Sequence, residues 1–166
     1  MIKDFVVFDD FIDYEGPFEV RKLYELIEHF IYNHHYDTNE KRNYERRNED
    51  GRYIEIELEP NKTVSNYIKL NLNIRIIVRD IQDITIEEKG DKKTIQQGNL
   101  SIRFRSFILK DRGSSWERNP SLFFLRHMVD KFVYKIHIGS YQDEVKNDTN
   151  LLQDNIRKFL NLYQRR

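Results

Sequence analysis

The chain has 166 residues and a mass of 20.4 kDa, which is the size of one domain able to bury a hydrophobic core. Its 28 Lys and Arg residues balance 28 Asp and Glu residues, which argues against a general polyanion binder, and the absence of cysteine excludes disulfides and thiolate chemistry. No apolar run is long enough to span a membrane, and acidic residues follow the N-terminus too closely for a signal peptide. We therefore expect one cytoplasmic domain over residues 1–166.

The N-terminal part of the chain predicts a strand followed by a helix. Residues 5–12 are rich in apolar side chains and predict the first strand. Gly16-Pro17 is expected to end this strand, with Pro17 in the first turn of the helix that follows. From Phe18 to about Tyr36, apolar residues recur at helical spacing with charged residues between them, which predicts an amphipathic helix.

The middle of the chain predicts an antiparallel sheet. Residues 37–50 are strongly polar and indicate a loop or an edge strand, leading into a turn at Asn48-Glu49-Asp50-Gly51. Residues 54–58 alternate Ile and Leu with Glu, and after a turn at Pro60-Asn61-Lys62 a long strand begins. Residues 68–78 carry apolar side chains at even positions and polar ones at most odd positions. This period of two is typical of strands in a sheet with one buried face.

A hairpin at Lys89-Gly90-Asp91-Lys92 continues this sheet. With Gly90-Asp91 as a two-residue turn, Ile86 lies opposite Ile95, an odd position, whereas the strand from Leu100 to Phe104 has its apolar residues at even positions. The change of parity requires an extra residue, and glycine accommodates one most easily. We therefore predict a β-bulge at Gly98-Asn99.

The C-terminal part of the chain predicts two helices after a loop at 111–119. Asn119-Pro120 has the form of an N-cap and a first helical residue. The apolar residues that follow support a helix, although residues 132–138 also alternate well enough to form a strand. Gly139-Ser140 predicts a break, and a last helix is expected from about Gln142 to Tyr163.

The predicted order of elements is β-α-β-β-β-β-α-α. This order indicates an α+β fold, an antiparallel β-meander of about five to six strands with the helices packed on one face. It loosely resembles the helix-grip arrangement, in which a curved sheet and a long C-terminal helix enclose a hydrophobic ligand. Residues 120–137 depart from that arrangement as an insertion before the last helix. The resemblance implies a small-molecule or lipid carrier, unless large side chains such as Phe104 and Phe159 fill the space between sheet and helix.

The polar face of the predicted sheet carries a group of basic residues. An open basic face with aromatic neighbours is one way to bind single-stranded nucleic acid. The adjacent strand, however, carries Glu55, Glu57 and Glu59, so the charges are expected to pair across the strands and the nucleic-acid hypothesis is the weaker one. The basic residues of this face are Lys69, Arg75, Arg79, Arg103 and Arg105.

The sequence predicts no catalytic residue, metal ligand or cofactor. No phosphate-binding loop, nucleophile elbow or metalloprotease motif is present. Glu25 and His29 lie four residues apart, which is ordinary surface pairing on a helix. The acidic group at Asp9, Asp10, Asp13 and Glu15 lacks the spacing of a calcium loop and is interpreted as a solvated strand end.

Our leading hypothesis from the sequence is a non-enzymatic domain that binds a protein partner or a second copy of itself. Aromatic and Arg side chains are typical anchors of protein interfaces. The candidates here are Trp116, Arg112, Arg118 and Phe124. For Trp116, the alternative is that the ring closes the open end of the core.

Overall fold

The computed structural model describes the backbone of residues 2–65, 67–110 and 120–164, and the side chains of these residues except those of 120–137. Strands and helices follow in the order β-α-β-β-β-β-β-α, and the fold is α+β as predicted. The elements are β1 (Ile2–Phe18), α1 (Val20–Asn33), β2 (Glu40–Asn48), β3 (Gly51–Leu58), β4 (Asn61–Ser65), β5 (Ile68–Glu88), β6 (Asp91–Lys110) and α2 (Pro120–Gln164).

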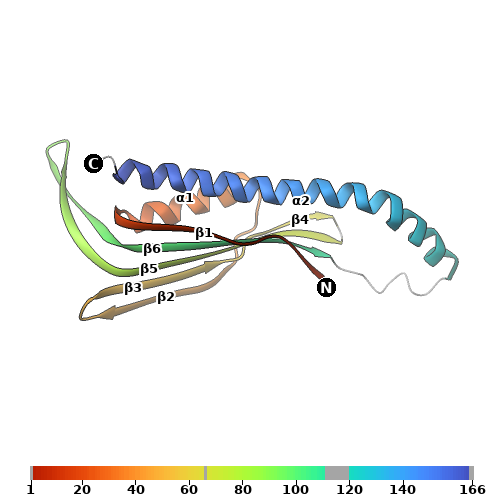
Figure 1. Ribbon diagram of the computed structural model, residues 1–166, viewed down its shortest axis with the longest axis horizontal. Coiled ribbons are helices and arrows are strands. Elements are labelled where there is room, and N and C mark those ends of the chain that lie inside the picture. The colour runs from red at the N-terminus through yellow and green to blue at the C-terminus, as the bar shows by residue number, and fades with distance from the viewer. Residues whose placement is uncertain (1, 66, 111–119, 165–166) are drawn as a thin grey trace.

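The six strands form one open antiparallel sheet, which confirms the predicted meander. The strand order is β1-β6-β5-β3-β2, and β4 pairs with the first residues of β5. β1 and β2 are therefore edge strands. The β5–β6 hairpin extends past the other strands and curls toward the side on which the helices lie (Figure 1).

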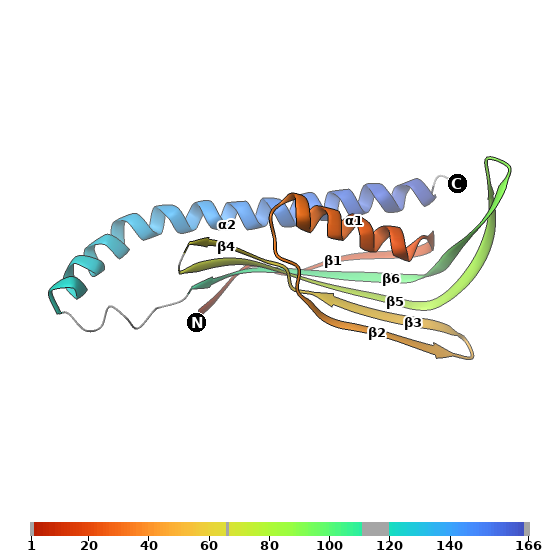
Figure 2. The ribbon, with the colours of Figure 1, turned by 180° about the vertical axis from the view of Figure 1, so that it is seen from behind.

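Both helices lie on the same side of the sheet, where α2 packs along the strands and α1 lies beside α2 (Figures 1 and 2). The prediction of two C-terminal helices is wrong, because α2 continues through Gly139-Ser140, and residues 132–138 are helical. A glycine inside a helix costs only about 1 kcal/mol relative to alanine, which the surrounding turns and the packed second half of α2 outweigh. Within the described ranges, no helix combines the length and apolarity needed to cross a membrane.

Side chains fill the layer between the sheet and the part of α2 whose side chains are described, residues 138–164. Apolar residues at even positions of β5 and β6, such as Ile74 and Phe104, belong to one hydrophobic cluster with Val145, Leu152 and Ile156 of α2. Each of these five side chains is at most 1% exposed. Burying one such side chain contributes roughly 1.5–3 kcal/mol, so this layer holds α2 on the sheet.

The N-terminal strand is longer than predicted. Gly16 and Pro17 do not end it, because β1 runs to Phe18 and Pro17 pairs with Gln97 of β6. Proline lacks a backbone donor and is tolerated on an edge strand, where one side of the backbone has no partner strand. The placement of Pro17 in the first turn of the helix is therefore wrong, and α1 begins at Val20.

The polar segment 37–50 contains an edge strand, one of its two predicted forms. All nine residues of β2 are exposed, and the Glu49-Asp50 turn joins Asn48 to Gly51 of β3. The short strand β4 was not predicted. It follows Pro60 and pairs with β5, where Lys62 lies opposite Leu70.

The turn of the β5–β6 hairpin is one residue earlier than predicted. Lys89 and Gly90 form it, both with positive φ (51° and 83°), as the favoured two-residue hairpin turn requires. Ile95 consequently lies opposite Ile84, not opposite Ile86.

The predicted irregularity at Gly98 exists, but the extra residue lies in the neighbouring strand. Arg79 pairs with Asn99 and Gln82 pairs with Gln97, so β5 contributes one more residue than β6 over this stretch. β6 itself keeps a continuous register with β1 here. A Cβ atom on Gly98 would lie 2.8 Å from the carbonyl oxygen of Arg79, so glycine allows the bulged strand to approach β6 closely.

Candidate functional site

The face of the sheet that points away from α2 is the candidate functional surface, here called the helix-free face. Period-two alternation places on it the odd-numbered residues of β3, of β5 up to Arg79 and of β6 from Asn99 onward, because Glu57 lies opposite Arg75 and Arg75 opposite Arg103. The even-numbered residues of the same stretches form the core beneath α2, whereas Ile81 and Ile95, beyond the bulge, are core residues at odd positions.

Glu55 is the centre of an ion-pair group on this face. Its carboxylate accepts hydrogen bonds from Arg75 (2.7 Å), Arg42 (3.2 Å) and the Tyr53 hydroxyl (3.1 Å), and the residue is only 6% exposed. Burial alone would raise the pKa of Glu55, but the hydrogen bonds from Arg75 and Tyr53 and the charges of both arginines outweigh it. The pKa of this carboxyl therefore lies below its usual range.

Asp9 of β1 forms a second ion-pair group with β6. Arg105 donates two hydrogen bonds to it, at 2.8 and 3.3 Å, and the Arg103 Nε atom lies 3.8 Å from the same carboxylate. The hydrogen bond from Arg105 holds the pKa of Asp9 below its usual range. The Arg103 Nε is buried and has no hydrogen-bond partner among the described residues.

The five basic residues predicted on the polar sheet face do not form one continuous positive patch. Arg75 is paired with Glu55, and Asp9 holds Arg105 and Arg103. Lys69 and Arg79 form no ion pair within the part of the chain that the structure describes. The diagonal pairing between β3 and β5 that the sequence predicts is the arrangement observed.

Three exposed phenylalanines of β1 lie along the same face, opposite residues 107 to 103 of β6, and are here called the β1 aromatic patch. Phe5, Phe8 and Phe11 are 44%, 64% and 55% exposed. The Phe5 ring lies 5.5 Å from the ring of Phe8 and 5.5 Å from that of Phe107, which is buried beneath the patch. Exposed rings grouped in this way are typical of interaction sites, whereas scattered apolar side chains are not.

Two irregularities in β1 bring these rings to one face. Phe5 pairs with Phe107, Val7 with Ser106, and Asp10 with Phe104, so the register shifts by one residue twice within six positions. Without these shifts, residues at a spacing of three would alternate between the two faces of the sheet. Phe8 consequently lies over Arg105, whose guanidinium carbon is 5.5 Å from the ring centroid.

The sequence did not identify this patch. Its interface candidates Trp116, Arg112 and Arg118 lie outside the described residues, and Phe124 lies in α2 where side chains are not described. The one feature of the sequence that pointed to the patch was the spacing of three between Phe5, Phe8 and Phe11, because a regular strand would place these residues on alternating faces. The sequence alone does not show that they share a face, since this depends on two register shifts in the pairing of β1 with β6.

The acidic residues Asp9, Asp10, Asp13 and Glu15 lie within β1 and not at a strand end as predicted, because β1 continues to Phe18, and Asp9 and Asp10 do not gather around a common point. Asp9 binds Arg105, whereas Asp10 accepts a 3.2 Å hydrogen bond from Gln153 of α2, on the opposite face. Glu25 is paired with Arg21 at 3.0 Å. Among the described residues, no group of three or more His, Asp or Glu side chains is placed to hold a metal ion.

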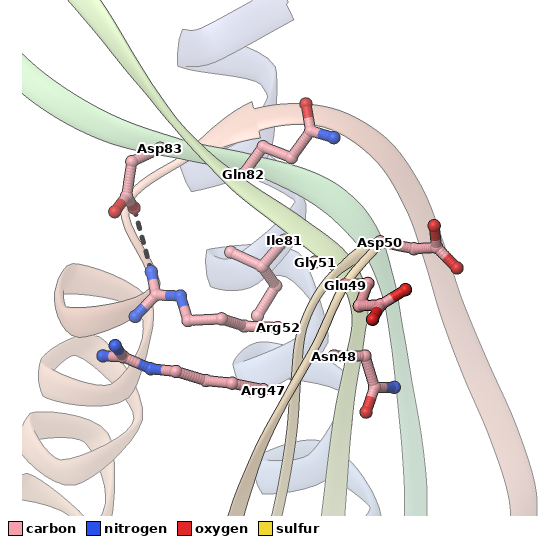
Figure 3. A pocket seen from close by; sticks show the side chains of 9 residues that line it. All are labelled: Arg47, Asn48, Glu49, Asp50, Gly51, Arg52, Ile81, Gln82 and Asp83. Carbon is pink, nitrogen blue, oxygen red and sulfur yellow. Dashed lines mark hydrogen bonds and ion pairs between the residues drawn. The ribbon is translucent and has the colours of Figure 1, made fainter.

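A hollow of about 540 Å³ lies at the tip of the β2–β3 hairpin beside the bend of β5 (Figure 3). Arg47 and Arg52 extend in one direction from the hairpin, and Glu49 and Asp50 point the other way. Arg52 donates a 2.9 Å hydrogen bond to Asp83, so its charge is already balanced. This hollow has mixed charge and no group of side chains that selects one ligand.

A groove of about 520 Å³ between α1 and α2 is more apolar. Leu26, Phe30, Phe159 and Leu162 line it together with His29, His34 and Lys158 among others. Leu162 is 62% exposed in this groove. The groove is separate from the filled layer between α2 and the sheet.

No known protein family matches this sequence, and no curated protein matches it.

Proposed function

We propose that this protein is a non-catalytic cytoplasmic domain that binds another protein through its helix-free face, with the β1 aromatic patch as the anchor. The observation that carries this proposal is the grouping of Phe5, Phe8 and Phe11 on one face of an edge strand, each at least 44% exposed. Clustered aromatic rings beside Arg side chains are the usual composition of interface centres.

The distribution of charge favours a protein partner over a nucleic acid. A phosphate backbone is bound by cations that are free to contact it, and Arg75 and Arg105 are already held by Glu55 and Asp9. The chain as a whole carries no net charge. A surface of paired charges around exposed rings suits a protein surface of mixed polarity.

The hydrophobic-carrier alternative receives less support. The space in which a helix-grip protein would hold its ligand contains Ile74, Phe104, Leu152 and Ile156, each at most 1% exposed. Among the described residues, exposed phenylalanines lie on β1, and an open apolar groove lies between the two helices.

Site-specific photo-crosslinking in living cells tests the proposal. The photoreactive residue p-benzoylphenylalanine replaces Phe8 in one variant and Tyr32 in the control, since Tyr32 is 78% exposed on α1, on the helix side of the sheet. We expect discrete protein adducts from position 8 that position 32 does not form. Introducing Phe5→Ser into the position-8 variant should remove these adducts.

Two outcomes would overturn the proposal. One is the absence of protein adducts from position 8, and the other is the same set of adducts from both positions. Adducts that nuclease treatment removes would instead favour the nucleic-acid alternative.

A further inference from the structure

We propose that the protein bound by the β1 aromatic patch is a second copy of this chain, arranged about a twofold axis that passes beside Phe8. This inference rests on the proposed function and names its partner. It is carried by the order and spacing of five side chains along β1: Lys3, Phe5, Phe8, Phe11 and Asp13.

The two register shifts of β1 space these five residues evenly along the sheet. Lys3, Phe5, Phe11 and Asp13 pair with residues 109, 107, 103 and 101 of β6, and Phe8 lies over Arg105. All five therefore occupy successive odd-numbered positions of β6, on the helix-free face. The series is symmetric in position about Phe8, with a cation at one end and an anion at the other.

The series of five side chains on one copy of β1 is complementary to the same series on a second copy that runs in the opposite direction. When two copies of β1 lie antiparallel with their helix-free faces in contact, Phe8 meets Phe8, Phe5 meets Phe11, and Lys3 meets Asp13. A twofold interface requires this property, because each contact between residue i and residue j is repeated as a contact between j and i.

The end charges of the series are available for a partner. Both Lys3 and Asp13 are exposed, and neither forms an ion pair with the described residues. The Lys3 ammonium lies 4.7 Å from the ring centroid of Phe107, at the border of the patch. By contrast, Asp9 beside the axis is already neutralised by Arg105, so no unpaired like charges meet there.

The contact is expected between side chains and not between strand backbones. β1 has a free edge, but two bulges within six residues interrupt the regular ladder that a continuous intermolecular sheet needs. The aromatic rings then provide the buried area, and the two Lys3–Asp13 pairs define the antiparallel direction.

Charge reversal at the two ends tests the twofold arrangement directly. The protein, at about 100 μM and below, is measured by sedimentation equilibrium and native mass spectrometry, and dimers have twice the 20.4 kDa chain mass. Lys3→Asp and Asp13→Lys should each weaken homodimers by roughly tenfold, because two ion pairs become two like-charge pairs. An equimolar mixture of the two variants should form heterodimers about as tightly as the wild-type protein, since every cross-contact is then complementary.

The same measurements of oligomeric state on Phe8→Ser test the aromatic contact, with Tyr32→Ser as the control. We expect Phe8→Ser to be monomeric, and Tyr32→Ser to remain dimeric. Because Phe8 is 64% exposed, Phe8→Ser should melt like the wild-type protein at concentrations low enough to dissociate the wild-type dimer, which removes the stabilisation that dimerisation adds. A wild-type chain that is monomeric throughout would overturn the second-copy inference. Position-8 crosslinks to a different protein would then still support the proposed function. Homodimers that both charge reversals leave unchanged would overturn the twofold arrangement.

Discussion

The hydroxyl group of Tyr36 donates a 2.7 Å hydrogen bond to the carboxylate of Asp148, joining positions 112 residues apart in the chain. Tyr36 follows α1 and is 4% exposed, and Asp148 lies in the well-packed part of α2. This contact links the connection between α1 and β2 to the C-terminal helix that covers the sheet. Burial first, and then the hydrogen bond to Asp148, raises the pKa of Tyr36 well above its ordinary value.

Tyr36→Phe is expected to lower the free energy of unfolding at neutral pH by about 1–2 kcal/mol, since the half-buried Asp148 carboxylate loses a hydrogen-bond donor. The wild-type protein should also lose stability as the pH rises above about 10, because tyrosine ionises in the unfolded state while folded Tyr36 stays protonated. This alkaline loss should be smaller in Tyr36→Phe. Urea unfolding from pH 8 upward measures both effects, with exposed Tyr32→Phe as the control. The prediction would be contradicted if Tyr36→Phe and Tyr32→Phe lost the same amount of unfolding free energy as the pH rises.

Glu55→Gln is expected to destabilise the protein by about 1 kcal/mol at neutral pH, because Arg75 and Arg42 lose their charged acceptor. The lowered pKa of Glu55 means that its contribution is present above the ordinary glutamate pKa and is lost as the pH falls. The stability of the variant should therefore decline less on acidification below about pH 4.5 than that of the wild type. Urea midpoints between neutral pH and pH 3 measure the difference. Glu49→Gln, in the exposed β2–β3 turn, is the matched control and should follow the wild-type curve.

Gly98→Ala is expected to destabilise the sheet by about 1–3 kcal/mol, because the added methyl group would lie 2.8 Å from the carbonyl oxygen of Arg79. Gly139→Ala should have the opposite effect on stability and raise the free energy of unfolding by about 0.5–1 kcal/mol. Among the described residues, its Cβ would meet no atom within 4 Å outside its own helix backbone, and alanine is the better helix former. Thermal unfolding of both variants checks the pair. A destabilising Gly139→Ala would argue against one continuous α2.

Ile156→Ala is expected to cost about 2–5 kcal/mol, because Ile156 is completely buried in the cluster that α2 shares with the sheet. Leu162→Ala, at a 62% exposed position of the same helix, should change stability by less than about 0.5 kcal/mol. Denaturant unfolding compares the two. Equal small effects would indicate that the layer beneath α2 is not tightly filled.

The alternation of apolar and polar residues predicted the meander and the buried face of β5 and β6 correctly. Because side chains of a strand alternate between the two faces of the sheet, Leu72, Ile74 and Ile76 can be buried together only if the even-numbered face points to the core. The amphipathic pattern predicted α1 for the same reason. Edge strand β2 has no buried residue, so pattern alone left it between strand and loop, and pairing of its backbone with β3 decided it.

The sequence by itself determined which side chains share a face in the regular stretches of β3, β5 and β6, because strand geometry and solvent exclusion act locally on each segment. Only the tertiary structure decided where the register changes. The extra residue opposite Gly98 lies in β5, and the two shifts that align Phe5, Phe8 and Phe11 lie in β1. A register shift is the outcome of competition between backbone pairing and side-chain packing across two strands, and neither strand alone contains that information.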